Sequence, residues 1–171
     1  MSRLSRRGFS LIALAALAAC GVRKPQIKRY FGPPVTQVVV YKGRRHMYLL
    51  SGNTVLKSYD FGLGFQPLGH KQFEGDGKTP EGLYFVDRFN PQSRYHLSVG
   101  ISYPNERDRE YAAQFNLSPG SDIMFHGRGP EGNRLVQGKP DWTAGCIAVR
   151  DDEIEDIYAM LQPGVPVMIH A

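Results

Sequence analysis

The sequence predicts a mainly β domain that carries one or two short helices. From residue 36 onward, runs rich in β-branched and aromatic residues alternate with short turns that contain glycine. This is the pattern of antiparallel strands. Clear helical periodicity appears in one segment near the C-terminus, so helices are expected to be few. The domain has about 140 residues, enough for a single hydrophobic core.

The strands are predicted from their composition and from the turns between them. Residues 36–64, TQVVVYKGRRHMYLLSGNTVLKSYDFGLG, are interrupted at residues 42–43 and 51–53, which predicts two or three antiparallel strands. The later strands are GLYFVDRF (82–89), YHLSVGISY (95–103), DIMFH (122–126), GCIAV (145–149) and VPVMI (165–169).

Two helices are expected. In DDEIEDIYAML, residues 151–161, the apolar residues fall at i, i+3, i+4 and i+7, and Pro163-Gly164 ends the segment. Its acidic start suits the positive end of the helix dipole and needs no metal ion. The second helix, NERDREYAAQF at residues 105–115, has a weaker pattern.

The first twenty residues, MSRLSRRGFSLIALAALAAC, are typical of an export signal. The apolar run covers residues 11–19, whereas a helix needs about 20 residues to cross a bilayer. SRRGFSL resembles a twin-arginine signal, and LAAC resembles a lipobox in which cleavage leaves lipid on Cys20. An ordinary signal peptide is the alternative. We therefore expect a signal peptide at 1–19, a polar tether at 20–34 and a folded domain at 35–171.

The charge distribution argues against nucleic-acid binding. The whole chain has a formal charge of +5, from 21 basic and 16 acidic residues, but three of the arginines lie in the signal. The remaining 18 basic residues nearly balance the 16 acidic ones. No basic stripe with interleaved aromatic residues occurs, so we expect no nucleic-acid partner.

Cys146 is the residue that most strongly suggests chemistry. If Cys20 carries lipid, no second cysteine remains to form a disulfide within the chain. A free thiol in an exported protein is either a reactive group or a buried inert side chain. His126 is the candidate base, since histidine titrates near neutral pH. It precedes a long Gly- and Pro-rich segment, and long loops in compact domains are usually functional.

A metal site is not expected. His70, His96, His126 and Cys146 have none of the local spacings of zinc ligands. EGDGKTPEG lacks the Walker spacing and leads into a strand, so it is interpreted as a turn-rich loop. We expect neither metal nor cofactor.

Four blocks in order, GHKQFEGDGKTPEGLY, YHLSVGISYPN, HG and TAGC, resemble the L,D-transpeptidase catalytic domain family of the YkuD type. The resemblance spans residues 36–169. It implies a β-sandwich-like domain that attacks the bond between meso-diaminopimelate and D-alanine in peptidoglycan stem peptides.

The resemblance also assigns roles to residues. It implies that Cys146 is the nucleophile and that His126 is its base, oriented by a backbone carbonyl. Backbone N–H groups around Gly145 and Cys146 would form the oxyanion hole, with Gly127 and Thr143 shaping the site. His70 and Tyr84 lie in matching blocks and are candidate cleft residues, although His70 also suits an anchor for its own loop.

The chain departs from the common family pattern at two positions. Ala144 stands where many members have histidine, and Ala148 stands where many have arginine or asparagine. Because residues 146, 148 and 150 face one way on a strand, Arg150 is a candidate for a displaced charge. Arg128 and Arg134 are rival candidates for binding substrate carboxylates, and Trp142 is expected to have a packing role.

The predicted function is therefore a periplasmic, lipid-anchored L,D-transpeptidase that remodels the cell wall, with the outer membrane weakly favoured. An alternative uses the same acyl-enzyme with water as acceptor, either as an L,D-carboxypeptidase or as an amidase that releases a lipoprotein linked to the wall. A third interpretation is a wall-binding lipoprotein without catalysis.

Overall fold

The computed structural model describes residues 24–171, so the predicted signal peptide and Cys20 lie outside the described residues. The described strands are β1 (Gln37–Tyr41), β2 (His46–Ser51), β3 (Thr54–Asp60), β4 (Gly82–Asn90), β5 (Ser98–Ile101), β6 (Met124–His126), β7 (Ile147–Ala148) and β8 (Pro166–His170). The described helices are α1 (Glu106–Ala113), α2 (Gly129–Leu135) and α3 (Asp151–Met160). The prediction of a mainly β domain is confirmed.

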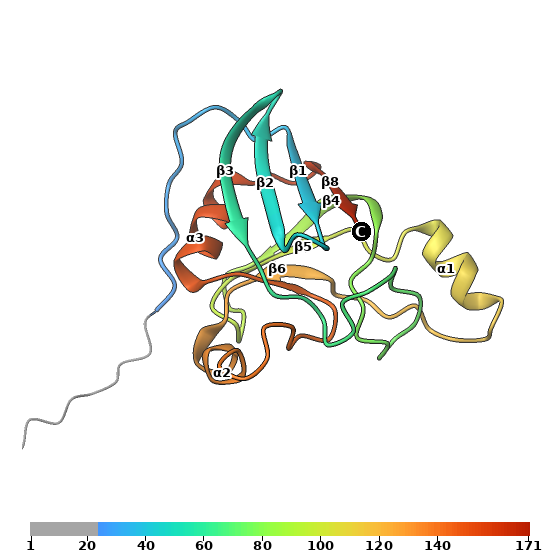
Figure 1. The fold of residues 1–171 in the computed structure, drawn as a ribbon. Helices are drawn as coiled ribbons and strands as arrows, with labels where there is room; N and C mark the ends of the chain where they lie inside the picture. The colour runs from blue at the N-terminus through green and yellow to red at the C-terminus, as the bar shows by residue number, and fades with distance from the viewer. Residues whose placement is uncertain (1–23) are drawn as a thin grey trace, which may run out of the picture.

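The strands form one curled sheet in the order β3-β2-β1-β8-β4-β5-β6-β7 (Figure 1). β1, β2 and β3 are antiparallel neighbours, as the turns predicted. The C-terminal strand β8 lies parallel to β1 and antiparallel to β4, so the last strand joins the two halves of the sheet.

At β1 and β8 the core lies on one face of the sheet. Val38 and Val40 of β1 are fully buried, as is Val167 of the neighbouring β8, because alternate side chains of a strand point to the same face. Ile154 and Ile157, which carry the helical period of α3, belong to the same hydrophobic cluster.

The cysteine segment is held on both sides by backbone pairing. β7 runs parallel to β6, with His126 opposite Ala148. On its other side, the segment that follows β3 forms bridges from Gly62 to Ala148 and from Gly64 to Thr143. Cys146 therefore lies one residue before β7, in a stretch that the sheet fixes at both edges.

A third helix, α2, lies inside the segment that the sequence analysis treated as loop without periodicity. Its two glycines have poor helix propensity, and the side chain of its N-cap residue, Arg128, forms no capping hydrogen bond. Asp151 of α3 supplies the cap instead, because Oδ1 accepts the N–H groups of Arg128 and Gly129 at 2.7 and 2.8 Å. A partner distant in sequence thus stabilises a helix that local propensity disfavours.

α1 and α3 lie where they were predicted. Asn105 caps α1 through a reciprocal pair of hydrogen bonds with Asp108. Among residues 24–171, no helix has the length and apolar character that crossing a membrane requires.

The described part of the predicted tether packs against the domain. Residues 24–34 form neither helix nor strand, yet they run beside α3 (Figure 1). The N–H of Gln26 donates to Glu155 Oε1 at 3.1 Å, and Lys28 Nζ donates to Asp156 Oδ1 at 2.7 Å. This segment therefore has a defined position on the domain surface.

Candidate active site

The turn before Cys146 is shaped by Thr143 and Gly145. The hydroxyl of Thr143 donates to the Cys146 carbonyl at 2.7 Å and accepts the N–H of Gly145 at 3.1 Å. Gly145 has φ +134, and a Cβ there would lie 2.5 Å from the carbonyl oxygen of Lys78. Only glycine fits this conformation and this close approach.

The loop of residues 69–81 lies behind this turn and supports it. Thr79 Oγ1 donates to the Gly145 carbonyl at 2.8 Å, in a fully buried position. Asp76 organises the loop through its carboxylate, which accepts a hydrogen bond from the Lys71 ammonium at 2.8 Å. It also accepts hydrogen bonds from the backbone N–H groups of Gln72, Phe73 and Lys78 at 2.8 to 3.0 Å. The block EGDGKTPEG thus supports the site, through the hydroxyl of Thr79 and the carboxylate of Asp76.

His126 ends β6 and is almost completely buried, with 3% of its surface exposed. Its Nδ1 lies 2.6 Å from the Gly127 carbonyl. A carbonyl can only accept, so Nδ1 carries the proton and Nε2 of the neutral ring is left as an acceptor. Tyr95 stacks on the ring at 4.7 Å between centroids, and Trp142 contacts it edge-on at 5.6 Å.

Burial dominates the electrostatics of His126. It lowers the pKa of the imidazole to about 4, while the Gly127 carbonyl and the charge of Asp151 act in the opposite direction. The histidine is therefore neutral at pH 7, as a general base must be before it accepts a proton.

Cys146 is half-buried, and its Sγ donates to the Asp122 carbonyl at 3.3 Å. Burial raises the pKa of its thiol to about 11, against a hydrogen bond from the Met124 backbone that lowers it. Within the described residues, Sγ makes no hydrogen bond to His126. The resting site thus holds a neutral imidazole at the end of β6 and a neutral thiol one residue before the neighbouring strand β7.

The backbone N–H groups near the thiol differ in their availability. The N–H of Gly145 is already bound by Thr143 Oγ1. In the described part of the chain, no hydrogen bond is formed by the N–H of Cys146. Cys146 N–H is therefore the donor that remains for an oxyanion, whereas Gly145 contributes its conformation.

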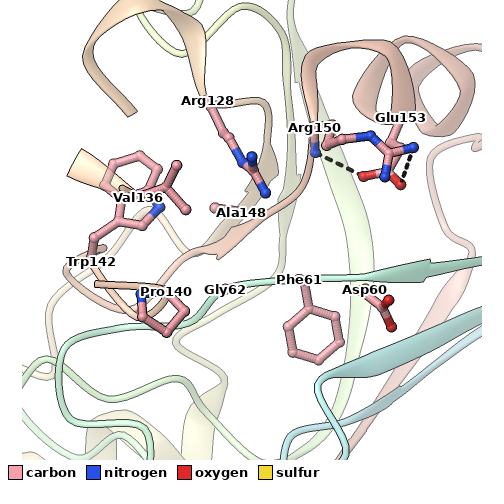
Figure 2. Close-up of a pocket in the computed structure, with 10 residues that line it drawn as sticks. All are labelled: Asp60, Phe61, Gly62, Arg128, Val136, Pro140, Trp142, Ala148, Arg150 and Glu153. Atoms are coloured by element: carbon pink, nitrogen blue, oxygen red, sulfur yellow. Dashed lines mark hydrogen bonds and ion pairs between the residues drawn. The ribbon is translucent and has the colours of Figure 1, made fainter. Parts of the chain in front are cut away.

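A cavity of about 150 Å³ lies between α2 and the start of α3, next to the histidine strand. Its lining includes Ala148, which is paired with His126, and Trp142, which contacts the imidazole (Figure 2). These two residues connect the cavity to the histidine, so it is a candidate space for part of a substrate.

Two of the arginines that the sequence suggested for substrate binding, Arg128 and Arg150, line this cavity and differ in their ion pairs. Figure 2 shows the Arg150 guanidinium turned toward Glu153, at 2.9 Å, and it also lies 3.3 Å from Asp152. The expectation that Arg150 continues the strand of Ala148 is wrong, because β7 ends at Ala148 and Arg150 is the N-cap residue of α3, where its charge is paired with acidic residues of that helix. The Arg128 side chain points into the cavity from the start of α2 and forms no ion pair with the described residues.

The other predicted binding residues lie elsewhere. Arg134 is exposed in the last turn of α2 and does not line the cavity. His70 Nε2 lies 3.2 Å from Asp108, and Tyr84 donates to the same carboxylate at 3.0 Å. His70 and Tyr84 line a second cavity of about 770 Å³ beside α1, which shares no residue with the first.

His70 also anchors its loop, because its Nδ1 accepts the N–H of Glu81 at 2.9 Å. Within residues 24–171, no group of three or more His, Cys, Asp or Glu side chains is arranged to hold a metal ion.

Sequence reasoning missed residues that support the site from a distance. A Cβ on Gly64 would lie 2.9 Å from the Cα of Gly145 and 2.0 Å from the Gly77 carbonyl oxygen, so this glycine permits the close approach of three segments. The paired glycines of DFGLG were the available signal. The capping role of Asp151 had none, since its acidic side chain was explained by the helix dipole alone.

In this mainly β domain, a histidine that is oriented by a carbonyl ends one strand, and a cysteine comes one residue before the neighbouring strand. Together they define a candidate thiol acyltransferase or hydrolase site. The family model of the L,D-transpeptidase catalytic domain, YkuD, matches residues 36–169. The chain therefore belongs to the L,D-transpeptidase family of enzymes.

Among curated proteins, YafK of Escherichia coli, whose name assigns it to the L,D-transpeptidases only provisionally, is 30% identical over 162 residues. That match covers 87% of this chain and 58% of YafK, so the chain spans little more than half the length of this relative.

Solved structures show the same fold. The helical cell shape determining protein Pgp2 of Campylobacter jejuni matches with a TM-score of 0.62 and 26% identity, over 85% of this chain and 51% of its own. Bd1075 of Bdellovibrio bacteriovorus matches with a TM-score of 0.56 and 25% identity, over 80% of this chain and 48% of its own.

Proposed function

We propose that this chain is a peptidoglycan L,D-transpeptidase in which Cys146 forms an acyl-enzyme at the meso-diaminopimelate–D-alanine bond. The observation that carries the proposal is the bond from His126 Nδ1 to the Gly127 carbonyl. It leaves Nε2 free to accept a proton, on a strand paired with the segment that follows the cysteine.

Proton transfer must accompany attack in this mechanism. Burial raises the thiol pKa to about 11 and lowers the imidazole pKa to about 4, so the pair is neutral before substrate arrives. The thiol would turn from the Asp122 carbonyl toward His126, and Sγ would bond to the diaminopimelate carbonyl carbon as its proton passes to Nε2. The carbonyl oxygen would take the negative charge and accept the N–H of Cys146.

Collapse of this intermediate completes the first half of the reaction. The carbon–nitrogen bond to D-alanine breaks, His126 returns the proton to the leaving amine, and a thioester remains on Cys146. An acceptor amine then attacks the thioester while His126 removes its proton. The new amide forms, the carbon–sulfur bond breaks and the thiol is restored. Water in place of the amine would give hydrolysis.

The proposed setting follows from the leader. Lipid on Cys20 would anchor the domain to a membrane facing the periplasm, with the outer membrane favoured, where the substrate is the cell wall. The similarity to Pgp2, whose name describes a determinant of helical cell shape, supports a role in wall remodelling.

The test is mass spectrometry of the soluble domain with disaccharide-tetrapeptide fragments, using wild type and Cys146→Ala. A crosslinked dimer with loss of D-alanine, absent with Cys146→Ala, is the expected result. Tripeptide without dimer would replace transfer by carboxypeptidase activity. Activity only on walls carrying linked lipoprotein would identify an amidase, and equal results for both proteins on every substrate would leave a binding role.

A further inference from the structure

One peptide group connects the catalytic histidine to α3. The carbonyl of Gly127 accepts from His126 Nδ1 at 2.6 Å, and the N–H of the same peptide group, which belongs to Arg128, donates to Asp151 Oδ1 at 2.7 Å. The imidazole, the peptide and the carboxylate therefore form a continuous chain of hydrogen bonds.

The surroundings hold this arrangement in place. A Cβ on Gly127 would lie 2.7 Å from Asp151 Oδ1 and 2.8 Å from the Tyr95 carbonyl oxygen, so the carboxylate fits against a bare backbone. The same Oδ1 also accepts the N–H of Gly129 at 2.8 Å. These two N–H donors fix the position of the carboxylate at the start of α3.

A carboxylate bound to the N–H of a peptide group changes the hydrogen-bonding strength of the carbonyl in the same group. Hydrogen bonds in series polarise each other, most strongly in a buried, weakly polar environment. A negative charge on the N–H side increases the electron density on the carbonyl oxygen. A stronger acceptor at Nδ1 then favours the protonated imidazole, the form that His126 takes while Cys146 attacks.

We propose that Asp151 is the third member of the site, a positioning residue that orients His126 and increases its basicity through the Gly127–Arg128 peptide. It plays the part that a directly bonded carboxylate plays in a Ser-His-Asp triad, but acts across an intervening peptide. This inference rests on the proposed roles of Cys146 and His126.

Other charged groups near Asp151 must be separated from its effect. His96, from the segment between β4 and β5, places Nδ1 4.0 Å from Asp151 Oδ2, and its Nε2 lies 2.8 Å from Glu155 Oε1. Asp152 and Glu153 follow Asp151 on α3 and pair with Arg150, and the Arg128 side chain extends from α2. A control that removes a neighbouring charge is therefore essential.

The test compares Asp151→Asn with the matched control Asp152→Asn. Both remove one negative charge from the first turn of α3, but only Asp151 bonds to the histidine loop. The side-chain carbonyl of asparagine can still accept the N–H groups of Arg128 and Gly129, so the loop should keep its position while the peptide loses its charged partner. Amide NMR signals of Arg128 and Gly129 report whether it does.

The main readout is the rate at which iodoacetamide alkylates Cys146 between pH 5 and 9, because this needs no peptidoglycan substrate. A less basic His126 stabilises the reactive thiolate less well, so Asp151→Asn should slow alkylation at pH 7 by about tenfold, as a change of roughly one pKa unit implies. Asp152→Asn should change the rate less than about twofold. In turnover, kcat should fall for Asp151→Asn while KM stays near the wild-type value.

Each outcome of the alkylation experiment leads to a different conclusion. Equal alkylation rates for Asp151→Asn and Asp152→Asn would overturn the role of Asp151, even if the wild type is fully active on stem peptides. A slower rate for Asp151→Asn, in a protein whose wild type shows no turnover, would support the link to His126 and reject the proposed function instead. If Asp151→Asn fails to fold, Asp151→Glu is used in its place. This substitution keeps the charge but misplaces it, and an unchanged alkylation rate would again overturn the proposal.

Discussion

At the scale of single residues, the site depends on glycines, which have no side chain, and on charged side chains that are already paired. Arg150 is an example of a charge that is already paired. Strand alternation predicted that it would share a face with Cys146, but Arg150 is the N-cap residue of α3, and its ion pair with Glu153 depends on how that helix begins. Arg128, which has no ion pair within the described residues, is therefore the better candidate for a substrate carboxylate.

This difference leads to a prediction for Arg128→Ala. Removing the guanidinium should raise KM for tetrapeptide substrates by about tenfold and leave kcat within about twofold, because the charge contributes to binding in the ground and transition states alike. Steady-state kinetics on tetrapeptide fragments would measure both. Arg134→Ala on the same helix is the matched control, and an equal effect from that exposed residue would point to general charge attraction instead.

A second residue-scale prediction concerns Gly145. Gly145→Ala should destabilise the domain by about 3 kcal/mol, because alanine is strained at φ +134 and its Cβ would press against the Lys78 carbonyl oxygen at 2.5 Å. Urea denaturation would measure the loss. Gly138→Ala, where a Cβ meets nothing within 4 Å, should be nearly neutral, and equal stabilities for the two variants would contradict the steric interpretation.

At the scale of elements, the sequence predicted the helices and strands whose formation depends on residues close together in the chain. The β1–β2 and β2–β3 turns contain glycine, and α3 has a full apolar period, so these elements were found. α2 was missed because its cap comes from Asp151, sixteen residues beyond its last residue. The supporting role of the 69–81 loop was missed for the same reason, because its contact with Gly145 joins segments that are distant in the sequence.

That loop gives an element-scale prediction with a defined pH dependence. Burial alone would raise the pKa of Asp76, but the Lys71 ammonium and three N–H donors outweigh it and hold the pKa below its usual value of 3.8. The stabilisation from Asp76 should therefore be fully present above about pH 4 and be lost as the pH falls through its lower folded-state pKa.

Asp76→Asn removes this ionised partner and leaves the buried Lys71 charge uncompensated. It should cost about 2–4 kcal/mol at pH 7, and the difference from wild type should shrink below pH 4. Urea denaturation between pH 3 and 7 would test both points. Asp87→Asn, at a more exposed carboxylate paired with Arg88, should cost under about 1 kcal/mol, and a constant difference between wild type and Asp76→Asn at every pH would contradict the assignment.

At the scale of the whole molecule, the docked N-terminal segment changes how an anchored domain would reach its substrate. A free tether over residues 20–34 could extend about 50 Å. If Cys20 carries lipid and Gln26 stays bound to α3, only residues 20–25 separate the two, and these can extend about 20 Å. The domain would then work close to its membrane.

Lys28 is the residue whose removal should release this segment. Burial works against its charge, yet Asp156 and Glu155 raise its pKa above 10.5, so its stabilising contribution is present below that pH and is lost only as the pH rises through the folded-state pKa. Lys28→Ala should lower stability at pH 7 by about 0.5–1 kcal/mol, a small value because the side chain is one-third exposed.

So small a loss of stability would also fit a general effect of changing a surface residue. The informative measurement is therefore a local one, within the N-terminal segment. Amide hydrogen exchange of residues 26–30 should accelerate in Lys28→Ala, while exchange in β1 and β8 stays unchanged. Lys24→Ala, at an exposed lysine of the same segment, provides the control and should leave exchange as in wild type. If residues 26–30 exchange at the same rate in all three proteins, the ion pairs of Lys28 do not hold the segment, and the reach of an anchored domain would be set by the full length of residues 20–34.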